Sequence, residues 1–194
     1  MFDRPLDLPR PVASRPAPRF VPRGFSLLEL MIALSIGAIL VGLALPSMSS
    51  LMGGSKMGAT VNDLVYSLQS ARSEAIKRAG TVVLCPSTTS LDLDASCAAT
   101  SYASGWIVFA DADVDGQRDA DEELIIQSEP RDATFTFTTP GGTFASRVLF
   151  TDTGISADPI GNPLSGALRI VQASADETRD VLIAANGRVS SETP

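Results

Sequence analysis

A continuous apolar segment, residues 25–45, contains a single charged residue, Glu29, near its start. As an α-helix, its roughly 21 residues match the ~30 Å hydrocarbon core of a lipid bilayer. An ionised glutamate inside such a helix costs on the order of a few kcal/mol unless it lies at the interface or has a partner. The segment therefore predicts a transmembrane helix in which Glu29 has either an interfacial position or a functional role.

The preceding residues, 1–24, are basic and rich in proline, with five arginines against two aspartates. Arginines this close to a membrane span keep the N-terminus in the cytoplasm and place the rest of the chain outside. A secretory signal peptide would have a shorter apolar core, followed by a cleavage site among small residues. Here the helical pattern continues past Leu45, so we expect the segment to be retained as a single-pass anchor.

Residues 46–80 continue the helix as an amphipathic segment, because their apolar positions recur at helical spacing. Gly80 follows a basic last turn and is expected to cap the helix. The stripe of apolar positions is expected to be core. Its members are Val61, Leu64, Val65, Leu68, Ala71, Ala75 and Ile76.

From residue 81 onward the hydrophobic pattern has a period of two, and turn signals separate short β-rich runs. The segments 87–104 and 153–165 are expected to be exposed loops. The predicted fold class is α+β, with a long N-terminal helix packed on antiparallel β-sheets and a β-rich globular domain over residues 81–194. The expected strands are 81–85, 105–110, 123–127, 134–138, 147–151, 167–173 and 180–184.

The composition disfavours catalysis. The chain has a net charge of −7, and removing residues 1–24 leaves 10 basic and 20 acidic residues. It has no histidine, which is the commonest general base and the commonest metal ligand. A serine elbow, a phosphate loop and a paired-cysteine zinc motif are also missing from the sequence. We therefore predict that the protein is not an enzyme and needs no cofactor.

Residues 23–30, with the sequence RGFSLLEL, resemble the cleavage and methylation signal of type IV prepilins and type II secretion pseudopilins. The resemblance implies that a prepilin peptidase cuts between Gly24 and Phe25 and that the new amino group of Phe25 is N-methylated. It also implies an assembly role for Glu29, whose carboxylate would pair with the Phe25 ammonium of a neighbouring subunit. The protein would first reside in the bacterial inner membrane, with its C-terminal domain in the periplasm, and then enter a pilus or pseudopilus.

Two further segments, LCPS at 84–87 and GWIVFAD at 105–111, resemble the GspH/FimT family of H-type minor pseudopilins and related minor pilins. This resemblance implies a type IV pilin-like fold, with Trp106 and Phe109 in the core, and a low-copy subunit near the filament tip. The favoured function is a minor pseudopilin of a type II secretion system, and the alternative is a FimT-like minor pilin for pilus biogenesis or DNA uptake. Expected partners are other minor subunits and a secreted substrate bound by exposed loops.

Cys85 and Cys97 are the only cysteines, and both lie in the part of the chain predicted to be outside the cytoplasm. In an oxidising compartment two thiols most simply form a disulfide, here closing the loop of residues 86–96. By the loop-entropy estimate such a bond contributes roughly 3 kcal/mol. Two free thiols are the alternative interpretation.

Asp111, Asp113, Asp115, Gly116 and Glu122 have the spacing of a calcium-binding EF-hand loop, D-x-D-x-D-G-x5-E. Asp119 occupies a further ligand position of that loop. The flanking segments read as strands rather than helices, and Arg118 stands where an EF-hand has an apolar residue. A solvated acidic hairpin turn is the favoured interpretation, and a calcium site is the alternative.

Some FimT-like pilins carry a C-terminal G-R-x-R segment implicated in DNA binding, and residues 187–190 read GRVS. The second arginine is missing, and an acidic domain repels phosphate unless basic side chains gather in one place. Gly187 and Arg188 are therefore expected to form a turn, and DNA is the less favoured partner. The arginines that a basic patch would need to bring together are Arg147, Arg169, Arg179 and Arg188.

Overall fold

The computed structural model describes residues 24–98 and 100–194, with the backbone alone over residues 42–53. The predicted leader, residues 1–24, lies outside the described residues except for Gly24. The chain divides into two compact units at the bond between Leu43 and Ala44. Helix α1 (Leu27–Arg78) passes from the first unit into the second and is continuous through residue 46, as expected.

Local hydrogen bonds mark both ends of α1. At its start, the backbone N–H of Glu29 donates to Ser26 Oγ at 3.2 Å, as in a serine N-cap. At its end, the N–H of Gly80 donates to the carbonyl of Ala75 at 3.1 Å. Ala79 adopts the left-handed conformation with φ 49°. The expected cap at Gly80 is thus displaced by one residue, because a Schellman ending needs its left-handed residue one position earlier.

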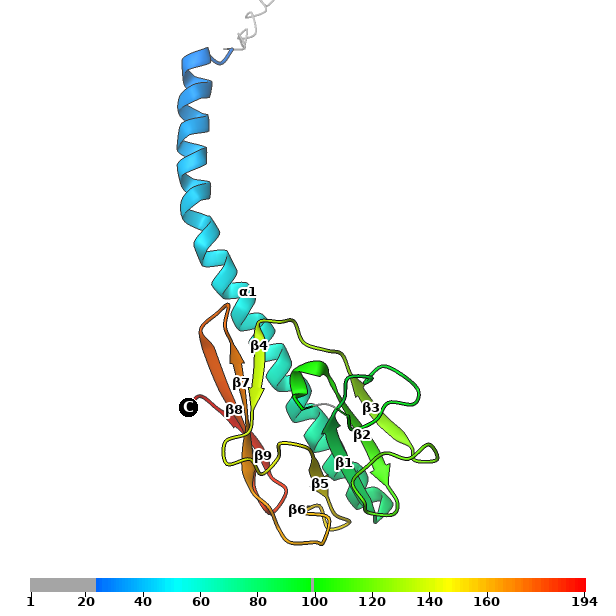
Figure 1. Cartoon of the computed structure of the whole chain (residues 1–194). Helices are drawn as coiled ribbons and strands as arrows, with labels where there is room; N and C mark the ends of the chain where they lie inside the picture. The colour runs from blue at the N-terminus through cyan, green and yellow to red at the C-terminus, as the bar shows by residue number, and fades with distance from the viewer. Residues whose placement is uncertain (1–23, 99) are drawn as a thin grey trace, which may run out of the picture. The chain divides into compact units, whose positions relative to one another are not determined.

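The second unit contains two antiparallel sheets, both of which lie along the C-terminal half of α1 (Figure 1). The first has five strands in the order β3-β2-β1-β5-β6, and the second has four in the order β4-β7-β8-β9. A short 3₁₀ helix, η1 (Tyr102–Ser104), precedes β2. The first sheet consists of β1 (Thr81–Pro86), β2 (Trp106–Asp111), β3 (Leu124–Ser128), β5 (Val148–Phe150) and β6 (Ser156–Ala157). The second consists of β4 (Phe135–Thr138), β7 (Gly166–Gln172), β8 (Glu177–Ile183) and β9 (Val189–Glu192).

All seven expected strands are present within a few residues of their predicted bounds, and the α+β prediction is confirmed. Strands β6 and β9 were not expected. The two residues of β6 are buried although they fall inside the predicted exposed loop 153–165. The sequence did not reveal this strand, because two residues are too few to show a period. The predicted loop 87–104 also contains buried residues, among them Tyr102, whose hydroxyl donates to the carbonyl of Phe144 at 2.9 Å.

The main core lies between α1 and both sheets. From α1 it takes most of the predicted stripe, while Ile76 is half exposed and Met57 is an additional buried residue. Trp106 on β2 is fully buried, donates from its indole N–H to Ser67 Oγ at 3.0 Å, and has the guanidinium of Arg131 4.5 Å from its ring centroid. Phe109 lies in a second, smaller cluster. The predicted structural role of both aromatic residues is confirmed.

Candidate functional site

The predicted processing site lies in a short non-helical segment directly before α1. Gly24, Phe25 and Ser26 precede the helix, and the side chain of Phe25 is 83% exposed. Glu29 is exposed in the first helical turn, where the positive end of the helix dipole favours an acidic side chain. The spacing of Ser26 and Glu29 is that of a capping box, a local signal that the sequence contained and that our prediction did not use.

Among the described residues of its unit, the helix that follows has no apolar partner. Between residues 27 and 41 the polar side chains are Glu29 and Ser35, and the Ser35 hydroxyl bonds to the carbonyl of Met31 within the helix. A helix that is apolar all round needs lipid or other helices to cover it. The large apolar residues between positions 25 and 41, each more than half exposed, are Phe25, Leu27, Leu28, Leu30, Met31, Ile32, Leu34, Ile36, Ile39, Leu40 and Val41.

Within the residues that the structure describes, no helix is both long enough and apolar enough to cross a bilayer. The predicted transmembrane segment, residues 25–45, extends into residues 42–45, whose side chains lie outside the described part. The transmembrane assignment therefore stays a prediction.

The connection between β2 and β3 holds the predicted acidic loop. One carboxylate oxygen from each of Asp111, Asp113 and Asp115 lies within 4.8 Å of the other two. Gly116 has φ 76° and donates its N–H to Asp111 Oδ2 at 3.0 Å. Burial raises the pKa of Asp111 to about 6, the Gly116 N–H opposes this shift, and the negative charge of Glu122 adds to it. The loop thus concentrates negative charge around one buried carboxyl group.

Glu122 has a different role from the one its spacing suggested. Its two carboxylate oxygens accept the backbone N–H groups of Ala112, at 2.6 Å, and Asp119, at 3.0 Å. Arg118 donates to the carbonyls of Glu122 and Ala95, at 3.2 and 3.0 Å. Glu122 and Asp119 are therefore outside the carboxylate cluster, and Glu122 closes the base of the loop.

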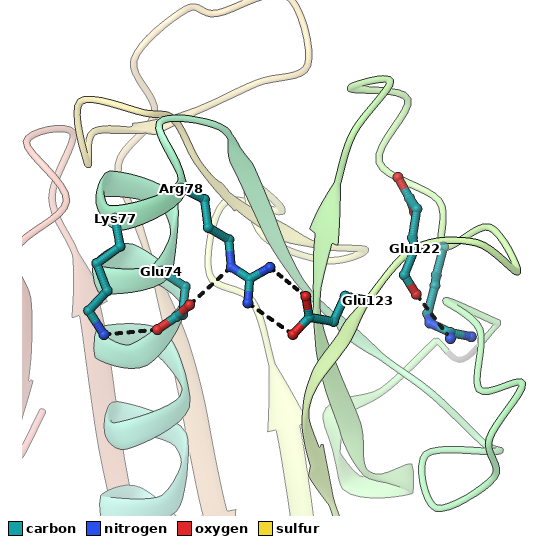
Figure 2. Close-up of polar contacts among 6 residues, drawn as sticks. Glu74, Lys77, Arg78, Glu122 and Glu123 are labelled. Carbon is teal, nitrogen blue, oxygen red and sulfur yellow. Dashed lines mark hydrogen bonds and ion pairs between the residues drawn. The ribbon is translucent and has the colours of Figure 1, made fainter.

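The C-terminal end of α1 is joined to the residue before β3 by an ion-pair network (Figure 2). The guanidinium of Arg78 donates to Glu74 on the helix and to both oxygens of Glu123, at 2.7–3.0 Å. The Arg78 hydrogen bond lowers the pKa of Glu123. Figure 2 shows that Glu123 points towards Arg78 while its neighbour Glu122 points away. Glu123 thus ties the β2–β3 connection to the helix, whereas its neighbour Glu122 closes the acidic loop.

A disulfide joins Cys85 on β1 to Cys97, with a Cα–Cα distance of 5.5 Å. The predicted pairing is confirmed, and the alternative of two free thiols is wrong for this structure. The bond encloses a loop that covers the smaller core cluster, to which Ala95 contributes. Because Arg118 donates to the carbonyl of Ala95, the disulfide loop and the acidic loop are neighbours.

Arg188 follows a tight turn, as expected. Gly187 has φ 75° and donates its N–H to the carbonyl of Ala184 at 2.8 Å, and Arg188 is exposed. The other arginines of the hypothetical DNA-binding patch already have partners. Arg169 forms two hydrogen bonds with Asp180 at 2.7 and 2.8 Å. Arg179 pairs with Glu177, and Arg147 donates to the carbonyl of Asp115.

The N-terminal helix is apolar and exposed, and it leads into an α+β domain with an internal disulfide. This arrangement is that of a pilin-like subunit. Family models match two parts of the chain: the prokaryotic N-terminal methylation motif over residues 21–45, and the type II transport protein GspH over residues 60–187. The chain belongs to the GspH family. Its relatives are structural subunits of pilin-type filaments, so membrane-anchored assembly with other pilins or pseudopilins follows from membership.

Solved structures that are similar to this chain in fold include those of two proteins. The type IV minor pilin FimU of Pseudomonas aeruginosa strain PAO1 is 18% identical, with 71% of this chain and 89% of that chain covered and a TM-score of 0.49. The minor pseudopilin EpsH from the type 2 secretion system of Vibrio cholerae is 14% identical, with 71% and 96% covered and a TM-score of 0.48. Among curated proteins, none matches the sequence significantly.

Proposed function

We propose that the protein is an H-type minor pseudopilin of a type II secretion system, a subunit near the tip of the pseudopilus. The match of the GspH model to residues 60–187 carries this proposal. The subunit acts through protein contacts rather than catalysis, in keeping with a chain that has no histidine. The alternative is a FimT-like minor pilin of a type IV pilus.

A prepilin peptidase on the cytoplasmic side of the inner membrane removes residues 1–24, and the amino group of Phe25 is then N-methylated. The exposed, non-helical backbone at Gly24 and Phe25 supports this step, because proteases cut preferentially where the backbone is exposed and irregular. The helix anchors the subunit before assembly, with the sheet-containing domain in the periplasm. An N-terminal residue other than Phe25 in protein from the native host would contradict this processing.

Glu29 pairs with the Phe25 ammonium of a neighbouring subunit during assembly. Support comes from its position in the first turn of a helix whose other residues up to position 41 carry no charge. A lone carboxylate is costly in an apolar environment, and so is a lone ammonium, but each offsets the desolvation of the other when they pair. Assembly is thereby coupled to processing, because the ammonium exists only after cleavage.

The test replaces Glu29 by Gln, which keeps the shape and removes the charge, with Ser35→Ala as the control in the same helix. We expect Glu29→Gln to be inserted in the membrane at wild-type levels but to decrease by about tenfold or more in sheared filaments. Ser35→Ala should be incorporated normally, because it removes only a hydrogen bond within the helix. Normal filament incorporation of Glu29→Gln would refute the pairing.

Deletion of the gene in the native host separates the two filament systems. A type II pseudopilin predicts loss of secreted proteins from the medium with intact pili, and a type IV minor pilin predicts loss of pili or of DNA uptake with intact secretion. The DNA hypothesis adds a salt-dependent shift of DNA that Arg188→Ala abolishes. The ion pairs of Arg169 and Arg179 disfavour it, because paired arginines neutralise fewer phosphates.

A further inference from the structure

The loop between β2 and β3 is the most acidic part of the described chain that the proposed function leaves unexplained. Residues 111–123 contain seven acidic side chains and one basic side chain. Three of the carboxylates, from Asp111, Asp113 and Asp115, converge so that one oxygen of each lies within 4.8 Å of the other two. Like charges held this close repel one another unless a cation lies between them.

The buried member of this cluster points to a ligand independently of the charge count. Asp111 is 1% exposed, and its Oδ1 has no hydrogen-bond partner among the described residues, while Oδ2 accepts the Gly116 N–H. A buried carboxylate oxygen without a partner is costly, and native structures seldom retain one. Asp113 and Asp115, by contrast, are exposed and each uses one oxygen to accept a loop N–H.

We propose that Asp111, Asp113 and Asp115 bind one Ca²⁺ ion in the β2–β3 loop. Calcium takes six to eight oxygen ligands in flexible geometry, whereas zinc prefers nitrogen and sulfur, and magnesium demands a near-ideal octahedron. Backbone carbonyls and water complete the coordination, as they do in calcium loops of this spacing, where the seventh position, here Gln117, supplies its carbonyl.

The ligand set differs from that of an EF-hand at its last position. There the glutamate binds the ion with both oxygens, but here both oxygens of Glu122 accept the N–H groups of Ala112 and Asp119. Glu122 is thus a positioning residue that closes the loop, and the ion loses one bidentate ligand. Affinity should accordingly be in the weaker range of extracellular calcium modules, with a dissociation constant of about 10⁻⁴–10⁻³ M.

Calorimetric titration of the metal-stripped full chain in detergent with calcium chloride tests the proposal. We expect one ion to bind the wild type, and magnesium chloride to bind about tenfold more weakly or not at all. Asp113→Asn should weaken calcium binding by about tenfold, since ligand charge sets affinity. Asp121→Asn is the matched control, because it removes the same charge from an exposed residue of the same loop outside the cluster. It should change affinity by less than about twofold.

Absence of calcium binding by the wild type up to about 5 mM would overturn the proposal, because that concentration exceeds the expected dissociation constant. An equal loss in Asp113→Asn and Asp121→Asn would also overturn it, since that result indicates diffuse attraction by the loop's charge. Circular dichroism checks the fold of each variant. If Asp113→Asn is misfolded, Asp115→Asn is the second test, with the same expected tenfold loss and the same contradicting result.

Discussion

The two ends of helix α1 have opposite surroundings. From residue 27 to 41 every large apolar side chain is more than half exposed, whereas Leu64, Leu68 and other apolar residues further along the same helix are fully buried. The second stretch is amphipathic and completes its core with the sheets of its own chain. The first is apolar all round, and a helix of that kind needs lipid or other helices to cover it.

This difference explains how a membrane-anchored filament subunit can be stable before assembly. The domain with the sheets packs around its own half of the helix and so has a hydrophobic core of its own. Under the proposed function, the exposed half keeps its apolar surface for lipid and then for neighbouring helices. Burial of each large apolar side chain is worth about 1.5–3 kcal/mol, so both environments offer a large driving force.

The largest expected effect directly tests this difference between the exposed and the buried half of α1. Leu64→Ala should lower the free energy of unfolding by about 2–5 kcal/mol, because it leaves a cavity in the main core. Leu34→Ala should change it by less than about 0.5 kcal/mol, because the side chain of Leu34 is exposed. Urea unfolding of the full chain in detergent, followed by the fluorescence of its only tryptophan, Trp106, measures both. An equal loss in the two variants would mean that residue 34 also packs within the chain.

The disulfide should have an intermediate effect that is confined to the second unit. Replacing both Cys85 and Cys97 by Ser should lower the free energy of unfolding by roughly 3 kcal/mol, since the unfolded chain regains the freedom of the closed loop. Extraction of the variant from membranes should be unchanged. A reducing agent serves as the control, because it should destabilise the wild type and leave the double variant unaffected. A change in membrane association would contradict the independence of the two regions.

The smallest of the three effects is the acid dependence of the ion pair between Arg169 and Asp180. Hydrogen bonds from Arg169 lower the pKa of Asp180 from its ordinary value of 3.8. The pair therefore stabilises the fold above pH 3.8, and this contribution disappears as the pH falls below that value towards the lowered pKa. Asp180→Asn should lower the free energy of unfolding by about 1–3 kcal/mol at neutral pH. It should also make that free energy less dependent on pH in the acidic range. Asp94→Asn, at an exposed loop position, should leave the curve unchanged.

Much of the fold was predictable because long elements carry clear periods. The buried stripe of α1 and seven strands followed from spacing alone. Strand β6 did not, because two residues show no alternation, and β9 did not, because most of its residues are polar and partly exposed. The left-handed cap residue of α1 is Ala79 rather than the expected Gly80, because of the backbone hydrogen bonds of the last turn.

The candidate sites were predictable to different degrees for a related reason. Gly24, Phe25 and Glu29 belong to a local motif that the N-terminal methylation model matches over residues 21–45, while cleavage and the role of Glu29 stay predictions. The spacing of Asp111, Asp113 and Asp115 likewise predicted that their carboxylates would lie together, as they do. The role of Glu122 was not predictable, because it depends on which backbone N–H groups the folded hairpin turns towards its carboxylate.

The sequence by itself determined the α+β class and the apolar N-terminal segment with its one acidic residue, and it favoured the cysteine pairing over two free thiols. These features depend on periodicity and on residues close together in the chain. Only the tertiary structure decided that Arg78 would hold Glu123, that Arg169 and Arg179 would be paired, and that one oxygen of Asp111 would be buried without a partner. The contact of Arg78 with Glu123 arises only when the helix packs on the first sheet, and that of Arg169 with Asp180 arises from the register of β7 against β8. The partner of Arg179 is Glu177 on the same strand, so that pair alone joins residues close together in the chain.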